Sequence, residues 1–235
     1  MKKKIVYVGL AADIVHEGHI NILKPAARLG YVIVGLLTDK AIASYKKLPY
    51  LEFNQRKIIL QNIKYVDQVV EQKTLDYVEN LKSFKPSYVV HGDDWKIGIQ
   101  KKTRQRVIKT LKLWGGKLVE PKYTKNISSS KIKNKISSFG VTPQNRVSKL
   151  RRLLNVKKIV RVLETHNSLT GLIVENLNFI KSSTINEFDG MWSSSLTDSL
   201  TKGKPDNQSV DYSTRILGLN YIMDVTSKPL IFDAD

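Results

Sequence analysis

The chain has 235 residues, 41% of them hydrophobic and 26% charged, which is the composition of a globular protein with a buried core. Its 39 Lys and Arg residues against 21 Asp and Glu residues give a formal net charge of +18. That charge indicates an anionic partner, which is nucleic acid, an anionic membrane surface, or a nucleotide and phosphate substrate. The absence of cysteine excludes a disulfide framework, a thiolate zinc site and a thiol nucleophile. No apolar stretch is long enough to span a bilayer, so we expect a cytoplasmic protein without a membrane partner.

The first half of the chain alternates short β-branched runs with amphipathic segments. Strands are expected over residues 3–11, 31–39, 67–72, 87–95 and 117–121, and helices over 20–30, 52–66, 74–86 and 101–116. A regular alternation of this kind favours a doubly wound parallel sheet of the α/β class.

A polar segment with Gly and Pro, residues 139–148, interrupts this alternation and is interpreted as a linker. We therefore expect one domain over residues 1–138 and another over 149–235. In the second domain, strands are predicted over 157–167, 187–195 and 228–235, and helices over 148–155, 168–179 and 213–226. Three β/α units do not close a barrel, so we expect this half to be a fragment, with completion by another chain as the alternative.

The sequence "HEGH" places His16 and His19 where the first strand gives way to a helix. Ligands of α/β sheets bind at the carboxyl ends of strands, next to helix N-termini. Two imidazoles and the free amides of a helix N-terminus suit negative charge that grows in a transition state. The alternative is a pair of capping or solvent-exposed histidines.

Other segments of the first half add groups that suit a phosphate-bearing ligand. "HGDDW", residues 91–95, ends another strand with two carboxylates and an indole. "ISSSK", residues 127–131, sets hydroxyls and a lysine at the start of a helix. Lys46, Lys47 and Arg56 supply positive charge between these segments. Together the segments predict a nucleotide site.

Residues 4–136 resemble the cytidylyltransferase family that includes glycerol-3-phosphate cytidylyltransferase, through "HEGH", "TDK", "NQRKIILQNIKYVDQVV", "HGDDW" and "ISSSKI". The resemblance implies an open α/β nucleotidyltransferase fold that joins CTP to an anionic acceptor, with Mg²⁺, and releases pyrophosphate. It implies that His16 and His19 stabilise the α-phosphate and the leaving group, assisted by Lys46 and Arg56. The nucleotide-binding residues that it implies are Asp13, Asp94, Trp95, Ser129, Ser130 and Lys131.

Two departures from the family pattern concern the acceptor. Leu10, Ala11, Ala12 and Asp13 stand where the family usually has Gly-Thr-Phe-Asp, which removes one hydroxyl contact. "KYTKN" replaces the family's Arg-Thr-Glu-Gly. Both changes touch acceptor or phosphate contacts, so we expect an acceptor other than glycerol 3-phosphate.

In the second half, "DAD" at a strand end suggests a magnesium site, because carboxylate oxygens suit that ion; a solvated acidic terminus is the alternative. The order "WSSSL", "KGKPD" and "DAD" resembles phosphoenolpyruvate mutase of the isocitrate lyase superfamily, a β/α barrel of which we expect only the first part here. The resemblance implies a substrate pocket and a metal pair. The pocket residues are Trp192, Ser194, Ser195 and Leu196; Asp206 matches the residue of the phosphoryl-transfer step, and Asp233 and Asp235 match the magnesium ligands.

The two resemblances together imply a small phosphonate acceptor, such as 2-aminoethylphosphonate or 2-hydroxyethylphosphonate, because phosphoenolpyruvate mutase makes a carbon–phosphorus bond. We expect a homo-oligomer with an active cytidylyltransferase half and no mutase activity in these 235 residues. The alternatives are a cytidylyltransferase for an alcohol phosphate such as glycerol 3-phosphate, and a basic module that binds nucleotides or nucleic acid without turnover. No aromatic platform for nucleic acid is found in the sequence, so nucleic acid is not the expected partner.

Overall fold

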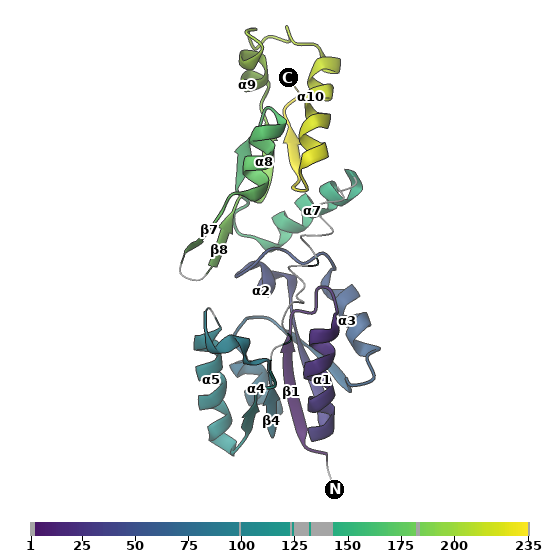
Figure 1. The fold of residues 1–235 in the computed structure, drawn as a ribbon, viewed down its shortest axis with the longest axis vertical. Coiled ribbons are helices and arrows are strands. Elements are labelled where there is room, and N and C mark those ends of the chain that lie inside the picture. The colour runs from purple at the N-terminus through teal and green to yellow at the C-terminus, as the bar shows by residue number, and fades with distance from the viewer. Residues whose placement is uncertain are drawn as a thin grey trace. The chain divides into compact units, whose positions relative to one another are not determined.

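The computed structural model describes residues 3–98, 100–122, 124, 132, 143–181 and 184–234. The chain forms two compact units, which are coloured purple to teal and green to yellow in Figure 1. Unit 1 comprises residues 1–133 with 182–184, and unit 2 comprises residues 134–181 with 185–235.

Unit 1 contains one sheet of five strands in the order β3-β2-β1-β4-β5, and every neighbouring pair is parallel. Its strands are β1 (Ile5–Leu10), β2 (Tyr31–Leu37), β3 (Gln68–Gln72), β4 (Tyr88–Val90) and β5 (Lys117–Val119). Its helices are α1 (Glu17–Leu29), α2 (Asp39–Ala43), α3 (Phe53–Gln61), α4 (Val78–Phe84) and α5 (Lys101–Leu111), with the 3₁₀ turns η1 (Asp93–Lys96) and η2 (Lys112–Trp114). The predicted doubly wound parallel sheet is confirmed.

Both faces of this sheet are buried, because successive residues of a strand point to opposite faces. Val6 and Val8 of β1 pack in one apolar cluster with Leu23 of α1, whereas Tyr7 packs in a second cluster with Leu81 of α4. The first cluster also receives α3 and the second α5, so two helices cover each face, as Figure 1 shows. The near-continuous apolar runs of β1 and β2 follow from burial on both sides.

The strand order fixes where a ligand would bind in unit 1. Chain order reverses between β1 and β4, which lie side by side in the middle of the sheet. In open α/β sheets, the crevice at such a reversal, outside the carboxyl ends of the strands, is the usual binding place. His16 follows β1, and His91 follows β4 directly.

Unit 2 contains a parallel three-stranded sheet in the order β10-β9-β6 and a two-stranded sheet. Its elements are α7 (Pro143–Val156), β6 (Val162–Glu164), α8 (Ser168–Asn176), β7 (Asn178–Lys181), β8 (Thr184–Glu187), β9 (Gly190–Ser193), α9 (Ser195–Thr201), α10 (Tyr212–Val225) and β10 (Leu230–Phe232). Val174 of α8, Met191 of β9 and Ile222 of α10 form its buried core. The predicted β/α alternation is therefore present.

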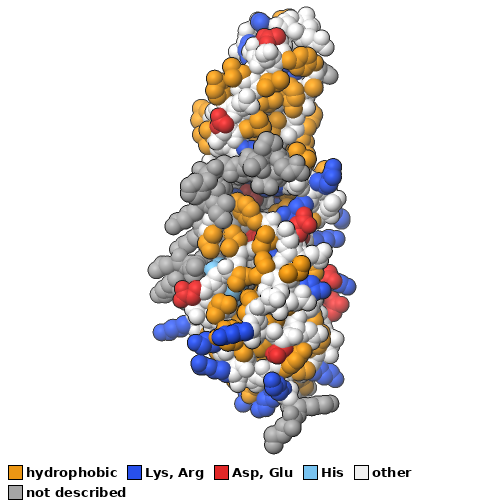
Figure 2. Space-filling view, turned by 90° about the vertical axis from the view of Figure 1, so that its right-hand side faces the viewer, with side chains coloured by type: hydrophobic (Ala, Val, Ile, Leu, Met, Phe, Trp, Pro, Cys, Tyr) orange, Lys and Arg blue, Asp and Glu red, His pale blue; other side chains and the backbone are white. Residues whose placement is uncertain are grey.

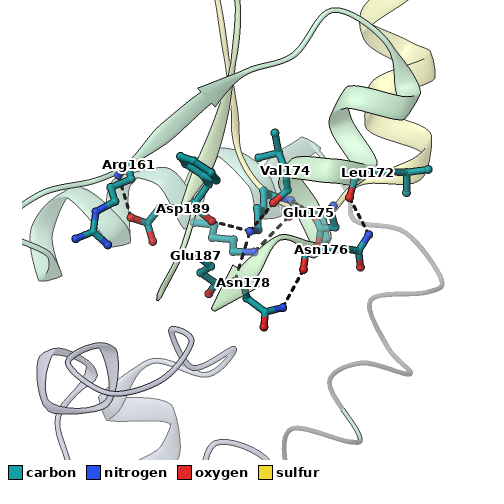
Figure 3. Close-up of polar contacts among 12 residues, drawn as sticks. Arg161, Leu172, Val174, Glu175, Asn176, Asn178, Glu187 and Asp189 are labelled. Carbon is teal, nitrogen blue, oxygen red and sulfur yellow. Dashed lines mark hydrogen bonds and ion pairs between the residues drawn. The ribbon is translucent and has the colours of Figure 1, made fainter. Parts of the chain in front are cut away.

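The hairpin strands β7 and β8 differ from the prediction, which continued the helix to residue 179. Two asparagines mark the end of α8: the Asn176 side chain donates to Leu172 O over 2.8 Å, and the Asn178 side chain donates to Asn176 O over 2.8 Å (Figure 3). Asparagine competes with the helix by bonding nearby backbone groups, and Leu177 between them is extended. The apolar spacing of "LIVENLNF" did not reveal this end.

Helix α7 begins at Pro143, inside the segment 139–148 that was expected to be a linker. Proline at the first helical position lacks only an N–H that would have no partner there. Arg146 is buried and donates to Lys228 O over 2.8 Å and Met223 O over 2.6 Å, which fixes α7 to the end of α10. Residues 143–148 therefore belong to unit 2, while 139–142 lie outside the described residues.

The surfaces of the two units differ. On the face shown in Figure 2, Lys and Arg side chains lie along both margins of unit 1 with acidic side chains among them, so they form no single basic stripe there. Unit 2 shows apolar side chains in this view. The exposed large apolar residues of α10 include Ile216, Leu217 and Tyr221. None of the helices in the described part of the chain is long and apolar enough to cross a membrane.

Candidate functional site

The two histidines of "HEGH" form the N-terminal cap of α1. His16 is the N-cap residue in an extended conformation, and its Nδ1 accepts from the Gly18 N–H over 3.1 Å. The N–H of His16 donates in turn to Nδ1 of His19 over 3.2 Å. The two imidazoles thus form a capping box, in which side chains accept from backbone amides that have no partner inside the helix. The capping alternative is therefore correct as a structural role.

The same hydrogen bonds determine which ring nitrogen of each histidine can donate to a ligand. Because each Nδ1 accepts a backbone N–H, the proton of each neutral imidazole is assigned to Nε2, which becomes a donor. Burial lowers the pKa of His16, and burial together with the positive charges of His16 and Lys46 lowers the pKa of His19 to about 4. Both rings are therefore neutral near pH 7, and their centroids lie 4.1 Å apart. The result is a pair of adjacent donors at a helix N-terminus, which suits an anion.

Gly18 is required by this arrangement. A Cβ at this position would lie 2.9 Å from Cε1 and 3.0 Å from Nδ1 of His16. Asn21, one turn further along α1, donates to the Thr124 hydroxyl over 3.0 Å, so residue 124 lies beside the same helix. The spacing H-x-G-H contains the glycine, but its packing role is visible only in the structure.

Arg56 is a fully buried arginine of α3, with 0% of its surface exposed. Its guanidinium donates to the carbonyls of Ala11, Leu37 and Leu51 and to the Asp39 carboxylate, at 2.7 Å for Asp39. Ala11 follows β1, Leu37 ends β2, Leu51 precedes α3 and Asp39 begins α2. The structure therefore places Arg56 beneath the carboxyl edge of the sheet as a connection between four segments.

Asp13 and Lys46 lie at the same edge. Asp13 is 2% exposed, and its Oδ1 accepts from the Leu51 N–H over 3.1 Å. Lys46 follows α2, its N–H donates to Ile42 O over 3.0 Å, and its Nζ lies 5.3 Å from the centre of the Tyr45 ring. The positive charge of Lys46 contributes to the lowered pKa of His19.

The segment "HGDDW" contributes an aromatic stack. The rings of His91 and Trp95 are stacked with centroids 3.9 Å apart and planes 7° apart. Trp95 is 1% exposed and the Asp94 side chain is 44% exposed, so of the two nucleotide-binding residues predicted in this segment only Asp94 presents its side chain to solvent. His91, which the sequence did not single out, covers the indole, and its Nδ1 lies 2.8 Å from Gly92 O.

A carboxylate holds the indole in place. The Trp95 indole N–H donates to Glu120 over 2.7 Å, and Arg104 forms a bidentate pair with the same carboxylate at 2.7 and 2.9 Å. The hydrogen bonds from Arg104 are the largest cause that lowers the pKa of Glu120 to about 2. The network ties β5 and α5 to the loop after β4. Neither Arg104 nor Glu120 was predicted, because no short-range pattern links them.

Four of the predicted residues cannot be placed. Ser129, Ser130 and Lys131, expected to bind phosphates, and Asp235, expected to bind magnesium, lie outside the described residues.

The predicted residues of unit 2 meet at the carboxyl ends of β9 and β10. The Ser195 hydroxyl lies 3.4 Å from Asp206 Oδ2 and 3.3 Å from Asp233 Oδ2, although 38 positions separate Ser195 and Asp233 in the chain. Trp192 is 38% exposed and Leu196 is 50% exposed, so both can contact a ligand at this edge. Ser194 is the N-cap residue of α9.

A buried arginine that the sequence did not single out supports this cluster. Arg215 of α10 donates to Asp233 O over 2.6 Å, stacks on Phe232 and lies 3.4 Å from the Asp198 carboxylate. Arg215 therefore fixes the backbone of the loop that carries Asp233.

Asp206, Asp233 and the Ser195 hydroxyl bring oxygen atoms together at this edge, and carboxylate oxygens are the kind of ligand that Mg²⁺ takes. Within the described ranges, no group of three His, Cys, Asp or Glu side chains lies close enough together to hold a metal ion.

A separate cavity of about 360 Å³ lies at the opposite, amino edge of the unit 2 strands. It is lined by Arg161, Leu177, Phe179, Asn186, Glu187 and Phe188, none of which was predicted. Near it the buried Asp189 accepts from the Arg161 N–H over 3.0 Å (Figure 3), and the buried Lys228 ammonium donates to Phe188 O and Val174 O at 2.6 and 2.9 Å.

Two family models match separate parts of the chain. Residues 7–135 match the family model described as cytidylyltransferase-like, and residues 150–235 match the model described as phosphoenolpyruvate phosphomutase. Glycerol-3-phosphate cytidylyltransferase of Bacillus subtilis is 39% identical over 103 residues, which are 41% of this chain and 74% of that protein. Ethanolamine-phosphate cytidylyltransferase of Mus musculus is 32% identical over 122 residues, which are 51% of this chain and 29% of that protein. A solved structure of a lipopolysaccharide core biosynthesis protein from Thermoplasma volcanium aligns with a TM-score of 0.45 and 22% identity, covering 52% of this chain and 99% of that one.

Proposed function

The chain belongs to the cytidylyltransferase-like family, and from this premise we propose that it transfers CMP from CTP to a small phosphonate and releases pyrophosphate. The observation that carries the proposal is the pair of neutral imidazoles at the N-terminus of α1, each with Nδ1 occupied by a backbone N–H and Nε2 assigned as a donor. Such a site would recognise the negatively charged phosphates of a nucleotide.

In the proposed reaction, an oxygen of the acceptor phosphonate attacks the α-phosphorus of CTP. A phosphorus–oxygen bond forms there, while the bond from the α-phosphorus to its bridging oxygen breaks and the electron pair leaves with pyrophosphate. Nothing in this displacement needs a covalent intermediate on the protein, so catalysis is positioning and stabilisation of charge. The Nε2–H groups of His16 and His19 would donate to the α-phosphate and the bridging oxygen, and Lys46 would neutralise the departing pyrophosphate.

We propose nucleotide-binding roles for Asp94 and for the undescribed residues Ser129, Ser130 and Lys131. Trp95 would act through His91, because the indole is covered by that ring. For unit 2 we propose a substrate pocket formed by Trp192, Ser194, Ser195 and Leu196, with Asp206 in the phosphoryl-transfer step. Asp233 and Asp235 would hold Mg²⁺, which when bound neutralises phosphate and carboxylate charge.

The phosphonate acceptor is supported by the match of residues 150–235 to the phosphoenolpyruvate phosphomutase model, since that chemistry forms a carbon–phosphorus bond. A phosphonate presents the same oxyanion to the α-phosphorus as an alcohol phosphate does. A second candidate is therefore an alcohol phosphate acceptor, which the glycerol-3-phosphate and ethanolamine-phosphate cytidylyltransferase relatives support. The cytoplasmic location and the homo-oligomer remain predictions.

The test is pyrophosphate release from CTP and Mg²⁺ by the full 235-residue chain, with one acceptor at a time. The acceptors are 2-aminoethylphosphonate, 2-hydroxyethylphosphonate, glycerol 3-phosphate and phosphoethanolamine. We expect a phosphonate to give the highest kcat/KM. A higher kcat/KM for either alcohol phosphate would replace the phosphonate with the second candidate.

A further inference from the structure

The segment between α2 and α3, residues 44–52, carries Lys46 past the carboxyl edge of the unit 1 sheet. At its start, Ser44 bonds back to α2: its N–H donates to Lys40 O over 3.2 Å and its hydroxyl donates to Ala41 O over 2.7 Å. Tyr45 packs against the buried cluster of Leu37, Ala41 and Ile42. The beginning of the segment is therefore fixed by α2 itself.

The other end of the segment is fixed at Leu51, and there the contacts are long-range. The Leu51 N–H donates to Oδ1 of Asp13 over 3.1 Å, and the Leu51 carbonyl accepts from Nε of Arg56 over 3.2 Å. Both partners are buried, Asp13 at 2% and Arg56 at 0% exposure. The N–H and the carbonyl of Leu51 are thus both bound by buried ionisable side chains, those of Asp13 and Arg56.

Arg56 connects this end of the segment to the sheet. Besides Leu51, its guanidinium donates to Ala11 O after β1, to Leu37 O of β2 over 2.9 Å, and to the Asp39 carboxylate at the start of α2. Asp13 also lies just after β1. The two side chains therefore set the position of the segment relative to the strand end from which His16 follows.

We propose that Asp13 and Arg56 are positioning residues that clamp Leu51 and so hold Lys46 beside His19 at the α1 N-terminus. This inference rests on the proposed function, because it gives Lys46 a place in the transfer of CMP. The backbone of the segment is held on both sides of the Lys46 side chain, because the Lys46 N–H donates to Ile42 O over 3.0 Å and the Leu51 N–H donates to Asp13 over 3.1 Å. If Asp13 or Arg56 instead bound the nucleotide directly, it would act through its charge. A positioning role and a direct binding role therefore respond differently to a substitution that keeps the hydrogen bond but removes the charge.

The clamp predicts different results for two substitutions of Asp13. Asp13→Ala removes the acceptor of the Leu51 N–H, whereas Asp13→Asn keeps an Oδ1 acceptor and loses the charge. We expect hydrogen exchange in the peptide that contains Leu51 to be at least about tenfold faster in Asp13→Ala, and within about threefold of wild type in Asp13→Asn. Arg56→Lys cannot reproduce a planar fork of donors, so it should also accelerate exchange by about tenfold or more.

The kinetic readout is CTP turnover with the best acceptor. A displacement of about 1 Å in a catalytic group can cost on the order of a hundredfold in rate. We expect kcat to fall by about that factor in Asp13→Ala and Arg56→Lys, with KM for CTP within about threefold, and kcat to recover to within about threefold in Asp13→Asn. Circular dichroism and thermal unfolding show whether each variant is folded.

Matched controls lie elsewhere in unit 1. Asp67 also accepts a backbone N–H, that of Val32 over 2.7 Å, but at the amino edge of the sheet, and Arg106 is an exposed arginine of α5 paired with Asp76. Asp67→Ala and Arg106→Lys should leave both exchange at Leu51 and kcat unchanged.

Three results would overturn the inference. They are unchanged exchange at Leu51 in both Asp13→Ala and Arg56→Lys, faster exchange with unchanged kcat, and an Asp13→Asn variant as slow as Asp13→Ala, since that would show a role for the charge. If wild type turns over none of the acceptors, the proposed function fails, and the exchange measurements alone then decide whether Asp13 and Arg56 clamp the segment.

Discussion

The N–H of His16 donates to Nδ1 of His19 across 3.2 Å, so each histidine takes part in the helix cap and keeps its remaining donor on Nε2. The backbone fixes which ring nitrogen carries the proton, and burial keeps the rings neutral near pH 7. An anion site preorganised in this way needs no rearrangement when charge develops on a phosphate.

Substitution of either histidine should abolish most of the activity. We expect His16→Ala and His19→Ala to lower kcat for pyrophosphate release by at least about a hundredfold, because one oriented donor lowers the barrier by ~2.7–4 kcal/mol. His16→Asn separates the two roles, since asparagine is a good N-cap but has no Nε2 donor. It should keep the thermal stability of wild type and lose kcat. His166→Ala, a histidine of unit 2, is the control; wild-type kcat in both alanine variants would refute the role of the pair.

Gly18→Ala tests the packing of the cap. The new Cβ would lie 2.9 Å from Cε1 of His16 and must displace that ring. We expect kcat to fall by about tenfold or more, because displaced catalytic groups lose rate steeply. Gly218→Ala is the matched control in α10, since a Cβ there would meet nothing within 4 Å. Equal kcat in wild type and Gly18→Ala would show that the position of the His16 ring is unimportant.

The stability of the fold should decrease on the acid side of neutrality through His19. Its pKa is about 4 in the folded chain, against about 6.5 in the unfolded chain. Between these values the unfolded chain binds the extra proton, so the free energy of unfolding falls as pH falls from about 6.5 towards about 4, by on the order of 3 kcal/mol. Above pH 6.5 the contribution is fully present.

Urea unfolding at a series of pH values measures this dependence. His19→Asn should show a smaller decrease in the free energy of unfolding between pH 6.5 and 4 than wild type. Identical pH dependence in wild type and His19→Asn would contradict the assignment.

Glu120 should contribute to stability through two partners. Glu120→Gln weakens the pair with Arg104 and the bond from the Trp95 indole, so we expect the free energy of unfolding to fall by about 1.5–3 kcal/mol at pH 7. Since the pKa of Glu120 is about 2, the difference from wild type should be complete above pH 4.5 and shrink as pH falls towards 2. The exposed Glu79→Gln is the control. A difference that did not change with pH would mean that the charge of Glu120 is unimportant.

The sequence predicted the alternation of unit 1 because its strands are buried on both faces and read as continuous apolar runs. It also placed His16, His19, Asp94 and Lys46 at one edge, since parallel strands deliver their carboxyl ends to the same side of a sheet. In unit 2 the resemblance to phosphoenolpyruvate mutase implied a site with Ser195, Asp206 and Asp233, and the Ser195 hydroxyl lies within 3.4 Å of both carboxylates.

Contacts between residues distant in sequence could not be predicted. The bidentate pair of Arg104 and Glu120 and the support of Asp233 by Arg215 leave no periodic pattern in one sequence. The resemblance to the cytidylyltransferase family implied that Arg56 assists catalysis. Its complete burial and four acceptors became visible only in the fold.

The most direct test of the central claim is phosphorus-31 NMR of a reaction of the 235-residue chain with CTP, Mg²⁺ and 2-aminoethylphosphonate or 2-hydroxyethylphosphonate. The account predicts a new phosphonate resonance coupled to the α-phosphorus of CMP, with pyrophosphate formed in equal amount. Coupled resonances only when glycerol 3-phosphate or phosphoethanolamine is supplied, or none with any acceptor, would contradict it.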